Sequence, residues 1–307
     1  MDFTPSGSSL IGSLIRLGKL GLPPLALAAG FLVGFAAVAR AAAPLLPTGQ
    51  AYTVRNAKIE MVWIPPGQFT MGSPETEQNR SPDEGPQTKV AISRGFWLGR
   101  SEITQAQWKA VMGTSINELF AQFYAEKQAT PNRTLTFPKE GPGNPMPCMT
   151  WEEAMEFCRK LAQQEREAGR LPEGWEYTLP TEAQWEYACR AGTSGAWAGD
   201  LDVMAWYGKN SGGTTQPVRQ KKPNAWGLYD MYGNVWEWCR DWYGDQLPGG
   251  AVTDPVGATS GTLRVYRGGS RRSSADTCRS AVRGGAAPDN RDDGVGFRLA
   301  LVPSPAK

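Results

Sequence analysis

Apolar positions along the chain follow the spacing of helices in one region and the short runs of strands in others. Ala154, Phe157, Cys158 and Leu161 have the i, i+3, i+4, i+7 spacing of one buried helical face, and this helix is predicted to end near Gly169. Segment 58–64 predicts a strand ending in a Pro-Pro-Gly turn, and a second strand, antiparallel to the first, is predicted through 69–71. Segments 263–266 and 296–299 also have the composition of short strands.

Helix starts are marked by capping boxes. In a capping box, a Thr side chain accepts a hydrogen bond from a backbone N–H of the first turn, and the side chain of a Glu or Gln three residues later accepts one from the backbone N–H of the Thr. Three such boxes predict three helices, and the last of these helices should end at Gly192. Segment 114–147 has the character of an insertion, with a further helix predicted over 117–128. The capping pairs are Thr104 with Gln107, Thr150 with Glu153, and Thr181 with Gln184.

The N-terminal region has the layout of a secretory signal. An uncharged, mostly apolar run over 20–39 follows Arg16 and Lys19 and ends at Ala39-Arg40-Ala41. The alternative is an uncleaved membrane anchor, since a helix needs about 20 apolar residues to span a bilayer. We therefore expect a signal peptide or anchor over 1–43, a linker over 44–54 and one domain over 55–303. The domain should be periplasmic, secreted or membrane-anchored on the extracytoplasmic side, and should contact membrane only through the N-terminal segment.

Composition narrows the chemistry that this domain can perform. The 12 Trp, 36 Gly and 24 Pro residues favour a loop-rich fold fixed by aromatic side chains. A net charge of +2 gives no argument for a nucleic-acid partner. The chain has no histidine, which excludes Ser-His-Asp and Cys-His catalysis and any metal site built on imidazole. A bound metal would have to be held by oxygen or sulfur.

Six motifs in a fixed order cover most of the predicted domain, and in this order they resemble the sulfatase-modifying-factor family. That family includes formylglycine-generating enzymes, pyoverdine-maturation proteins and non-enzymatic members with a C-type-lectin-like fold. The resemblance implies an α+β fold that is irregular and loop-rich, with short antiparallel strands and a few helices. The motifs are Met71-Gly72-Ser73, TEAQWEYA (181–188), NAWGLYDM (224–231), GNVWEW (233–238), Arg267-Gly268-Gly269-Ser270 and Gly296-Phe297-Arg298.

The family's oxidases hold copper(I) with two cysteines in the stretch after Gly-Gly-Ser, and this chain departs from that pattern. Ser273 stands where the first cysteine is expected, and Cys278 is the one sulfur nearby. Copper is therefore not expected, and no catalytic residue is assigned. We expect Cys278 to form a disulfide with Cys239 or Cys189, the alternative being a lone redox thiol. Iron chemistry of the ergothioneine-synthesis type needs histidines that are absent.

One metal site of the family matches the turn at 230–237. The resemblance implies that Ca²⁺ is bound by the side chains of Asp230 and Glu237 and the carbonyls of Gly233 and Val235, all hard oxygen donors. The alternative is that the two carboxylates cap the turn without a metal. A second calcium site near 210–215 lacks the expected carboxylates and is not assigned.

Segment 264–300 contains no Lys, Glu, Gln, Met or Trp. Its short runs between fixed motifs are similar to the variable region of diversity-generating-retroelement target proteins, in which rewritten side chains bind ligands. The alternative is an ordinary loop rich in small polar residues. Runs 271–274, 276–277, 284–287 and 292–295 should be displayed on one surface, while Arg267, Gly269, Cys278, Arg279, Phe297 and Arg298 support them. The predicted ligand-binding residues are Tyr266, Arg271, Arg272, Ser273, Ser274, Asp276, Thr277, Val282, Asp292, Asp293 and Val295.

Two functions follow from these observations. The first is an exported protein that binds a protein or small-molecule ligand, yet to be identified, through its C-terminal surface and performs no chemistry. The second is an extracytoplasmic oxidoreductase of the formylglycine-generating or pyoverdine-maturation type. The incomplete cysteine pair and the absence of histidine favour the first.

Overall fold

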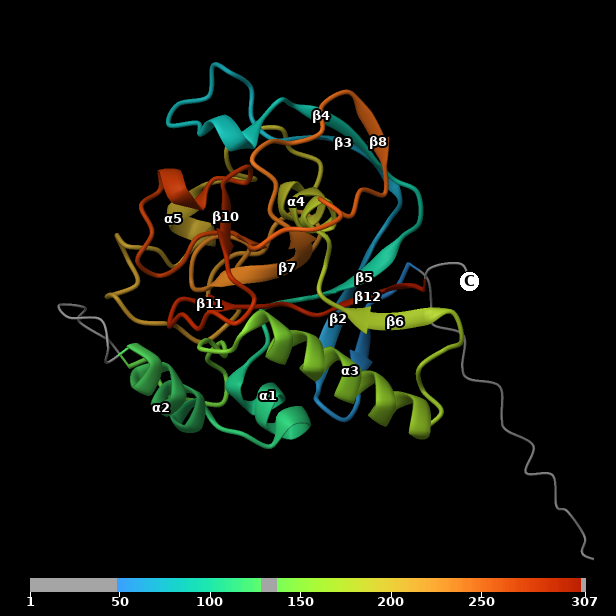
Figure 1. Cartoon of the computed structure of the whole chain (residues 1–307), viewed down its shortest axis with the longest axis vertical. Helices are drawn as coiled ribbons and strands as arrows, with labels where there is room; N and C mark the ends of the chain where they lie inside the picture. Colours follow the sequence, from blue (N-terminus) through green and yellow to red (C-terminus); the bar gives the residue numbers. More distant parts are fainter. Residues whose placement is uncertain (1–48, 128–136, 305–307) are drawn as a thin grey trace, which may run out of the picture. The chain divides into compact units, whose positions relative to one another are not determined.

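A computed structural model describes residues 49–127 and 137–304, so the signal or anchor predicted over 1–43 lies outside the described residues (Figure 1). Within them, no helix is both long and apolar enough to cross a membrane. The helices are α1 (Gln105–Met112), α2 (Ile116–Lys127), α3 (Trp151–Glu167), α4 (Glu182–Arg190) and α5 (Leu201–Met204), with 3₁₀ turns η1 (Pro82–Glu84) and η2 (Asp276–Cys278).

Twelve short strands of the described residues form three small sheets, of orders β1-β2-β5-β12-β6, β10-β9-β7-β11 and β3-β4-β8. Pairing is antiparallel except for β11 on β7 and β8 on β4. The strands are β1 (Tyr52–Val54), β2 (Ile59–Ile64), β3 (Gly67–Met71), β4 (Thr88–Ile92), β5 (Phe96–Gly99), β6 (Trp175–Thr178), β7 (Trp236–Trp242), β8 (Ala251–Thr253), β9 (Arg264–Arg267), β10 (Arg283–Ala286), β11 (Val295–Gly296) and β12 (Ala300–Pro303).

The predicted helix starts are confirmed. Thr104, Thr150 and Thr181 each cap a helix, and each accepts a hydrogen bond from the backbone N–H three residues on, with the reciprocal side-chain bond also present. Helix α4 ends at Arg190, and its C-cap Ala191 adopts the left-handed conformation one residue before the predicted Gly192. The helix predicted over 117–128 is α2, apart from residue 128, which lies outside the described residues.

The strand predictions are only partly right. Segments 59–64 and 67–71 are strands β2 and β3, but they belong to different sheets, since β2 pairs with β1 and β5 while β3 pairs with β4. The strand predicted at 296–299 is confined to the two-residue β11, because residues 297–299 leave the sheet before β12 begins. The α+β, loop-rich fold class is confirmed.

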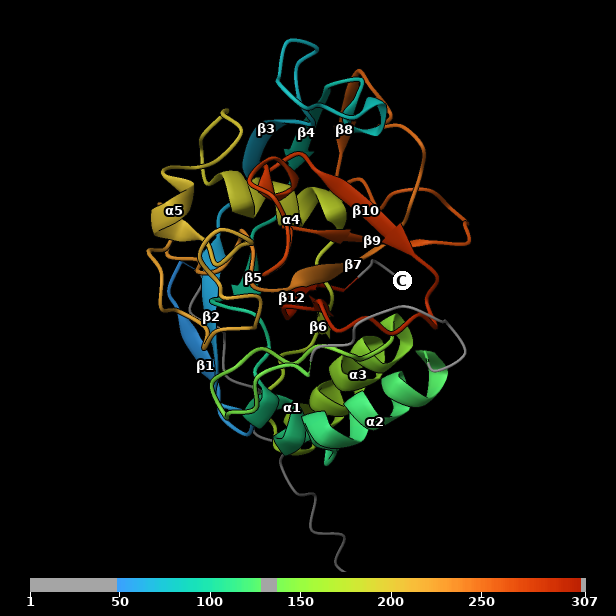
Figure 2. The same cartoon turned by 90° about the vertical axis from the view of Figure 1, so that its left-hand side faces the viewer.

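Two apolar clusters hold the described domain together. One lies beneath α1 and α3, where Trp108, Phe157 and Phe297 make ring contacts with centroids 5.3 to 6.2 Å apart. The other surrounds α4 and includes the buried Trp185. Figures 1 and 2 show α1, α2 and α3 gathered at one end, with α4 lying between the β7 sheet and the β3-β4-β8 sheet. Helix α4 therefore supports both smaller sheets.

Candidate functional site

The turn predicted to bind calcium has a tightly constrained backbone. Asp230, Gly233 and Asn234 all have positive φ angles of 55°, 76° and 55°. A Cβ on Gly233 would lie 2.1 Å from the carbonyl oxygen of Trp206, so glycine is required at that position. Glycine at position 233 is therefore explained by the shape of the turn, whether or not a metal is bound.

The two carboxylates of this turn have different surroundings. Asp230 is buried; its Oδ2 accepts a 2.7 Å hydrogen bond from the backbone N–H of Arg219, and its Oδ1 has no protein partner. Burial raises the pKa of Asp230 to about 6. Glu237 instead accepts two hydrogen bonds of 2.5 Å from the guanidinium of Arg298 and one of 2.6 Å from Trp185 Nε1. Glu237 thus already has a cationic partner, whereas Asp230 keeps an unsatisfied oxygen.

A third carboxylate, which the sequence did not reveal, completes this cluster. Glu102 is buried and accepts hydrogen bonds from Asn234 Nδ2 (2.7 Å) and from the backbone N–H of Val235 (3.0 Å). Burial, followed by repulsion from Asp230 and Glu237, raises the pKa of Glu102 well above its ordinary value. Glu102, Asp230 and Glu237 are thus three buried carboxylates near Arg298, and the charge of Arg219 also acts on Asp230. Among the described residues, no three acidic or cysteine side chains are close enough to form a metal cluster by themselves.

The expected disulfide of Cys278 is absent. All five cysteines are buried free thiols, so the pairing predicted with Cys239 or Cys189 is wrong. Cys278 lies directly beneath the backbone of Gly269, where a Cβ would approach its sulfur to 2.5 Å. Burial raises the pKa of the Cys278 thiol to about 12. Ser273, at the position of the first oxidase cysteine, uses its Oγ to accept a hydrogen bond from the backbone N–H of Ser270 (2.9 Å). No thiolate pair forms at this position.

Buried arginines hold the C-terminal segment in place, as its predicted supporting role requires. Arg267 pairs with Glu186 and donates to the carbonyls of Ala281 (2.8 Å) and Ser280 (3.0 Å). Arg279 donates to both carboxylate oxygens of Glu84, each at 2.7 Å. Cys278, Phe297 and Arg298 are also buried, as expected.

The prediction that the binding residues are displayed on the surface is wrong for three of them. Arg271, Asp293 and Val295 are buried; Arg271 donates to the Asp293 side chain at 3.0 Å and to its carbonyl at 2.5 Å. Arg272 also pairs with Asp293 (2.7 and 2.9 Å), yet its side chain is 38% exposed.

The other predicted binding residues are at least partly exposed. Tyr266 is half-buried against Trp236 and Trp238, with ring centroids 5.0 and 5.7 Å away. Arg272, Ser274 and Asp276 are exposed, and Ser273, Thr277, Val282 and Asp292 are half-buried.

The run at 284–287 is also less available than predicted. It forms most of edge strand β10, which pairs with β9 alone. A Cβ on Gly284 would lie 2.1 Å from the ring of Tyr266, and one on Gly285 would lie 3.1 Å from the ring of Tyr243. The stretch that remains solvent-facing is 272–277, and we refer to it as the exposed loop.

Residues 49–302 match the sulfatase-modifying factor enzyme 1-like domain, and the chain therefore belongs to this family. The formylglycine-generating enzyme of Mus musculus is 29% identical over 296 residues, which cover 80% of this chain and 75% of that enzyme. The enzyme of the same name from Streptomyces coelicolor is 33% identical over 180 residues, covering 52% of this chain and 53% of that enzyme.

Two solved structures are similar over most of the described domain. Treponema denticola variable protein 1 aligns with a TM-score of 0.68 and 30% identity, covering 84% of this chain and 100% of that one. PvdO from Pseudomonas aeruginosa aligns with a TM-score of 0.67 and 28% identity, covering 84% of this chain and 99% of that one. The family resemblance and the fold are confirmed, and relatives named as enzymes and as a variable protein stand at comparable distance.

Proposed function

We propose that this protein is an exported ligand-binding protein whose binding surface is centred on the exposed loop. The observation that carries the proposal is the contrast along 264–298 between buried, clamped arginines and the solvent-facing residues between them. Arg272, Ser274 and Asp276 are exposed, while Arg267, Arg271 and Arg279 on either side are buried in ion pairs. A substitution at a surface position costs about 0.5 kcal/mol of stability or less, whereas a substitution that breaks a buried ion pair is strongly destabilising.

A rigid support beneath the exposed loop improves binding, because the loop then loses less conformational entropy when it binds a ligand. The loop is also tied internally, since the hydroxyls of Ser274 and Thr277 lie 3.0 Å apart and Ser273 Oγ accepts from Ser270. The bond from Ser270 to Ser273 and the buried Arg271 and Arg279 would therefore hold the backbone when the exposed side chains change. The likeness to Treponema denticola variable protein 1 supports the idea that this loop is diversified by a retroelement.

The chemistry of the sulfur atoms supports binding over oxidation. Copper(I) is held by thiolates, and a thiol must be deprotonated to ligate. The thiols of Cys278 and Cys189 have pKa values raised by burial to about 12 and about 11, and no cysteine follows Gly-Gly-Ser at position 273. We therefore assign no catalytic residue and no copper.

We propose that calcium, where bound, has a structural role at the 230–237 turn. Asp230 Oδ1 and the carbonyls of Gly233 and Val235 would supply hard oxygen ligands, and Glu237 would contribute through a carboxylate already shared with Arg298. The cation would offset the repulsion among buried carboxylates. It lies in the frame of the domain and takes no part in ligand contact.

The loop proposal is tested by replacing exposed side chains together. The variant Arg272→Asn, Ser274→Asn, Asp276→Asn, Thr277→Asn is compared with wild type on an array of glycans and exported bacterial proteins. A control variant carries Arg55→Asn, Glu75→Gln and Glu173→Gln, which alter exposed positions elsewhere. We expect the loop variant to change the bound set and to lower the melting temperature by no more than about 4 °C, because it removes the partly exposed Arg272–Asp293 pair and the Ser274–Thr277 contact, and the control to change neither. An unchanged bound set, or a cooperative loss of folding, contradicts the proposal.

The source of diversity has its own test. We expect a reverse-transcriptase gene near this gene, together with a near-identical, adenine-rich copy of the segment encoding 264–300. A locus with neither feature removes the diversification part of the proposal and leaves the binding part to the array.

The alternative is an extracytoplasmic oxidoreductase, favoured by 29% identity to a formylglycine-generating enzyme over 80% of the chain. The mature protein is incubated with a cysteine-containing sulfatase peptide, copper and oxygen, and the mass of the peptide is then measured by mass spectrometry. We expect no aldehyde. Stoichiometric formylglycine would overturn the binding-only function.

A further inference from the structure

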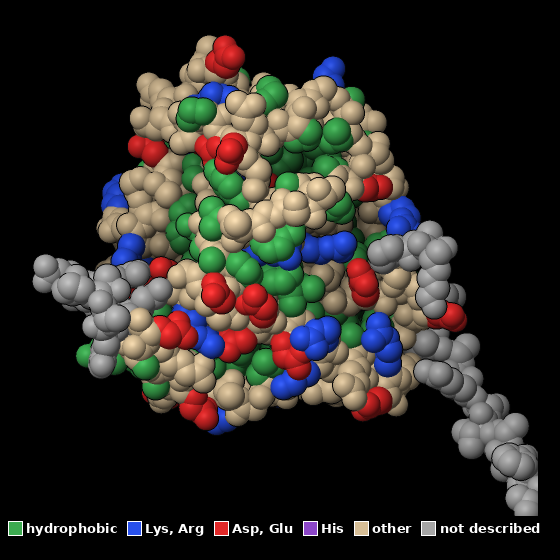
Figure 3. Space-filling model, in the orientation of Figure 1, with side chains coloured by type: hydrophobic (Ala, Val, Ile, Leu, Met, Phe, Trp, Pro, Cys, Tyr) green, Lys and Arg blue, Asp and Glu red, His purple; other side chains and the backbone are tan. Residues whose placement is uncertain are grey.

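A pocket of about 440 Å³ lies between the two smaller sheets, away from the exposed loop, and shares no lining residue with it. Its walls come from β3, β4 and β8 on one side and from β7, β10 and the first turn of α4 on the other. In Figure 3, hydrophobic side chains gather in a recess beside β4 and β8. This volume falls in the range of small-molecule sites, which span roughly 300 to 1,000 Å³.

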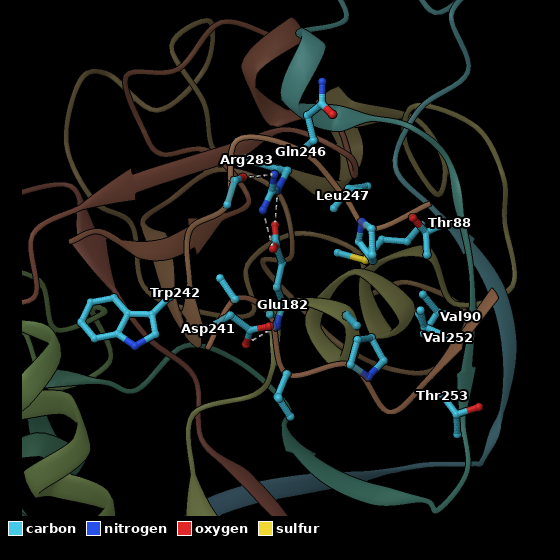
Figure 4. A pocket seen from close by; sticks show the side chains of 18 residues that line it. Thr88, Val90, Glu182, Asp241, Trp242, Gln246, Leu247, Val252, Thr253 and Arg283 are labelled. Carbon is cyan, nitrogen blue, oxygen red and sulfur yellow. Dashed lines mark hydrogen bonds and ion pairs between the residues drawn. The ribbon is translucent and has the colours of Figure 1, made fainter. Parts of the chain in front are cut away.

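The lining is apolar over most of its surface. Its apolar lining includes Met71, Val90, Leu247 and Val252, together with residues 255–258. Figure 4 shows Val90 and Val252 facing the opposite wall, which carries Asp241 and Glu182. A ligand that fills this space would bury an apolar body against the valines and leave one end at the carboxylates.

Three buried polar side chains line the pocket, Thr88, Glu182 and Asp241, and all but Asp241 are fully engaged. Glu182 accepts hydrogen bonds from Arg283 Nε (2.6 Å) and Nη2 (2.9 Å), and Arg283 Nη1 also donates to the carbonyls of Asp83 (2.9 Å) and Gly244 (2.8 Å). Thr88 Oγ1 donates to one carbonyl and accepts from one backbone N–H. These groups are therefore satisfied without a ligand.

Asp241 is the exception. It is buried, and its Oδ2 accepts one hydrogen bond, from the backbone N–H of Glu182 at 2.9 Å. Among the described residues, no Lys or Arg nitrogen lies within 4 Å of this carboxylate. Gly257, with a φ of 75°, packs against this side chain, since a Cβ there would lie 2.9 Å from Asp241 Oδ1. A buried carboxylate without a cationic partner is costly, and it attracts any cation that can reach it.

We propose that this pocket binds a small apolar amine, whose ammonium group pairs with Asp241 and whose hydrocarbon body fills the space against Val90 and Val252. Charge complementarity selects the amine over an acid, because the negative charge of Glu182 is already paired with Arg283, whereas that of Asp241 is not. The apolar walls select an aliphatic or aromatic body over a sugar or a polar peptide. The site lies outside the exposed loop and is independent of the proposed function.

The groups that face Asp241 also predict how binding depends on pH. Burial and the charge of Glu182 on α4 raise the pKa of Asp241 to about 7, while Arg240 on β7 and Arg283 on β10 act in the opposite direction. A protonated Asp241 offers no charge to an ammonium. Affinity for the amine should therefore fall as the pH decreases from 8 to 6.

The experiment uses phenethylamine as the probe and 2-phenylethanol and 3-phenylpropionate as matched neutral and anionic controls, with isothermal titration calorimetry on the full chain. We expect phenethylamine to bind wild type at least tenfold more tightly than the alcohol, and the acid not to bind. Asp241→Asn keeps an acceptor for the Glu182 N–H and should weaken amine binding at least tenfold, with alcohol binding changed less than about twofold.

Two further variants keep the outcome decisive. Val256 lines the pocket and is 56% exposed, so Val256→Arg should obstruct the mouth and weaken both probes with the fold intact. Val203→Ser on α5 changes an exposed residue that does not line the pocket and should bind as wild type does. The proposal fails if no amine binds saturably, if Asp241→Asn binds it as tightly as wild type, or if alcohol and amine bind equally. The Asn loop variant should bind phenethylamine normally, which separates this failure from failure of the proposed function.

Discussion

The most informative single substitution is Asp241→Asn, because the structure predicts that it will stabilise the protein at alkaline pH. Asp241 has an ordinary pKa of 3.8 and a folded-state pKa of about 7, raised by burial and by Glu182. The folded state therefore holds a proton that the unfolded state has released between about pH 4 and pH 7. Stability of the wild type falls as pH rises through this window, since the unfolded chain ionises freely and the folded one does not.

The magnitude follows from the shift. A difference of about 3 pKa units corresponds to about 4 kcal/mol, at about 1.36 kcal/mol per unit. Asn at 241 has no charge to bury and still offers an oxygen to the Glu182 N–H, so the variant escapes this penalty. Relative to wild type, its free energy of unfolding should increase by about 4 kcal/mol between pH 4 and pH 8. For a domain of this size that corresponds to a melting-temperature difference growing by roughly 10 °C.

The assay is thermal unfolding of both proteins, followed by circular dichroism at half-unit steps from pH 4 to pH 8. Val203→Ser serves as the control and should run parallel to wild type at every pH. The result that refutes the reasoning is a pH-independent difference between Asp241→Asn and wild type, which would mean that Asp241 titrates in the folded state as it does in the unfolded chain. A variant that loses stability increasingly toward pH 8 would indicate a cationic partner for Asp241.

Three further predictions test other parts of the structure. Arg271→Ala should cost about 3 to 5 kcal/mol in urea unfolding, because it removes a fully buried guanidinium and leaves the buried Asp293 with the partly exposed Arg272. Arg272→Ala should cost about 1 kcal/mol or less, because Arg271 still pairs with Asp293; equal costs would contradict the buried ion pair. In the native protein no thiol should react with Ellman's reagent at pH 8, and all five should react in guanidinium; prompt reaction of Cys278 in the native state would show that it is exposed. Chelation of calcium should lower the melting temperature of wild type but not of Asp230→Asn, which is a cleaner test than removing Glu237, the partner of Arg298; an unchanged wild type would exclude the calcium site.

Local features of the fold were predictable from the sequence because their causes lie within a few residues. A Thr followed three residues later by Gln or Glu closes a capping box by itself, so Thr104, Thr150 and Thr181 mark helix starts without knowledge of the rest of the molecule. Sheet partnership is different. Strand β3 has β4 as its neighbour, and nothing in residues 67–71 specifies that choice over β2.

The parts of the site that escaped prediction depend on contacts between distant residues. Arg271 stands in a polar run that predicts a surface residue, but it is buried because its guanidinium pairs with Asp293, 22 positions later. Glu102 reaches the 230–237 turn across more than 130 residues and belongs to no motif. The amine pocket combines residues from 71 to 283, so no local pattern announces it. The expected disulfide failed because cysteine spacing carries no information on which sulfurs meet.

The ion pairs of the buried arginines, here called the arginine clamps, also determine how the domain responds to acid. A guanidinium keeps its charge at any pH that a protein meets, so each clamp is released only when its carboxylate takes up a proton. Burial opposes ionisation of Glu84 and Glu182, but Arg279 holds the pKa of the first, and Arg283 with Arg267 the pKa of the second, below the ordinary value of 4.5. These contributions to stability are complete above that value and are lost only as pH falls through the lowered pKa values. A surface supported in this way keeps its shape in mild acid and also at neutral and alkaline pH, where ion pairs built on histidine would lose their cation above about pH 6.5.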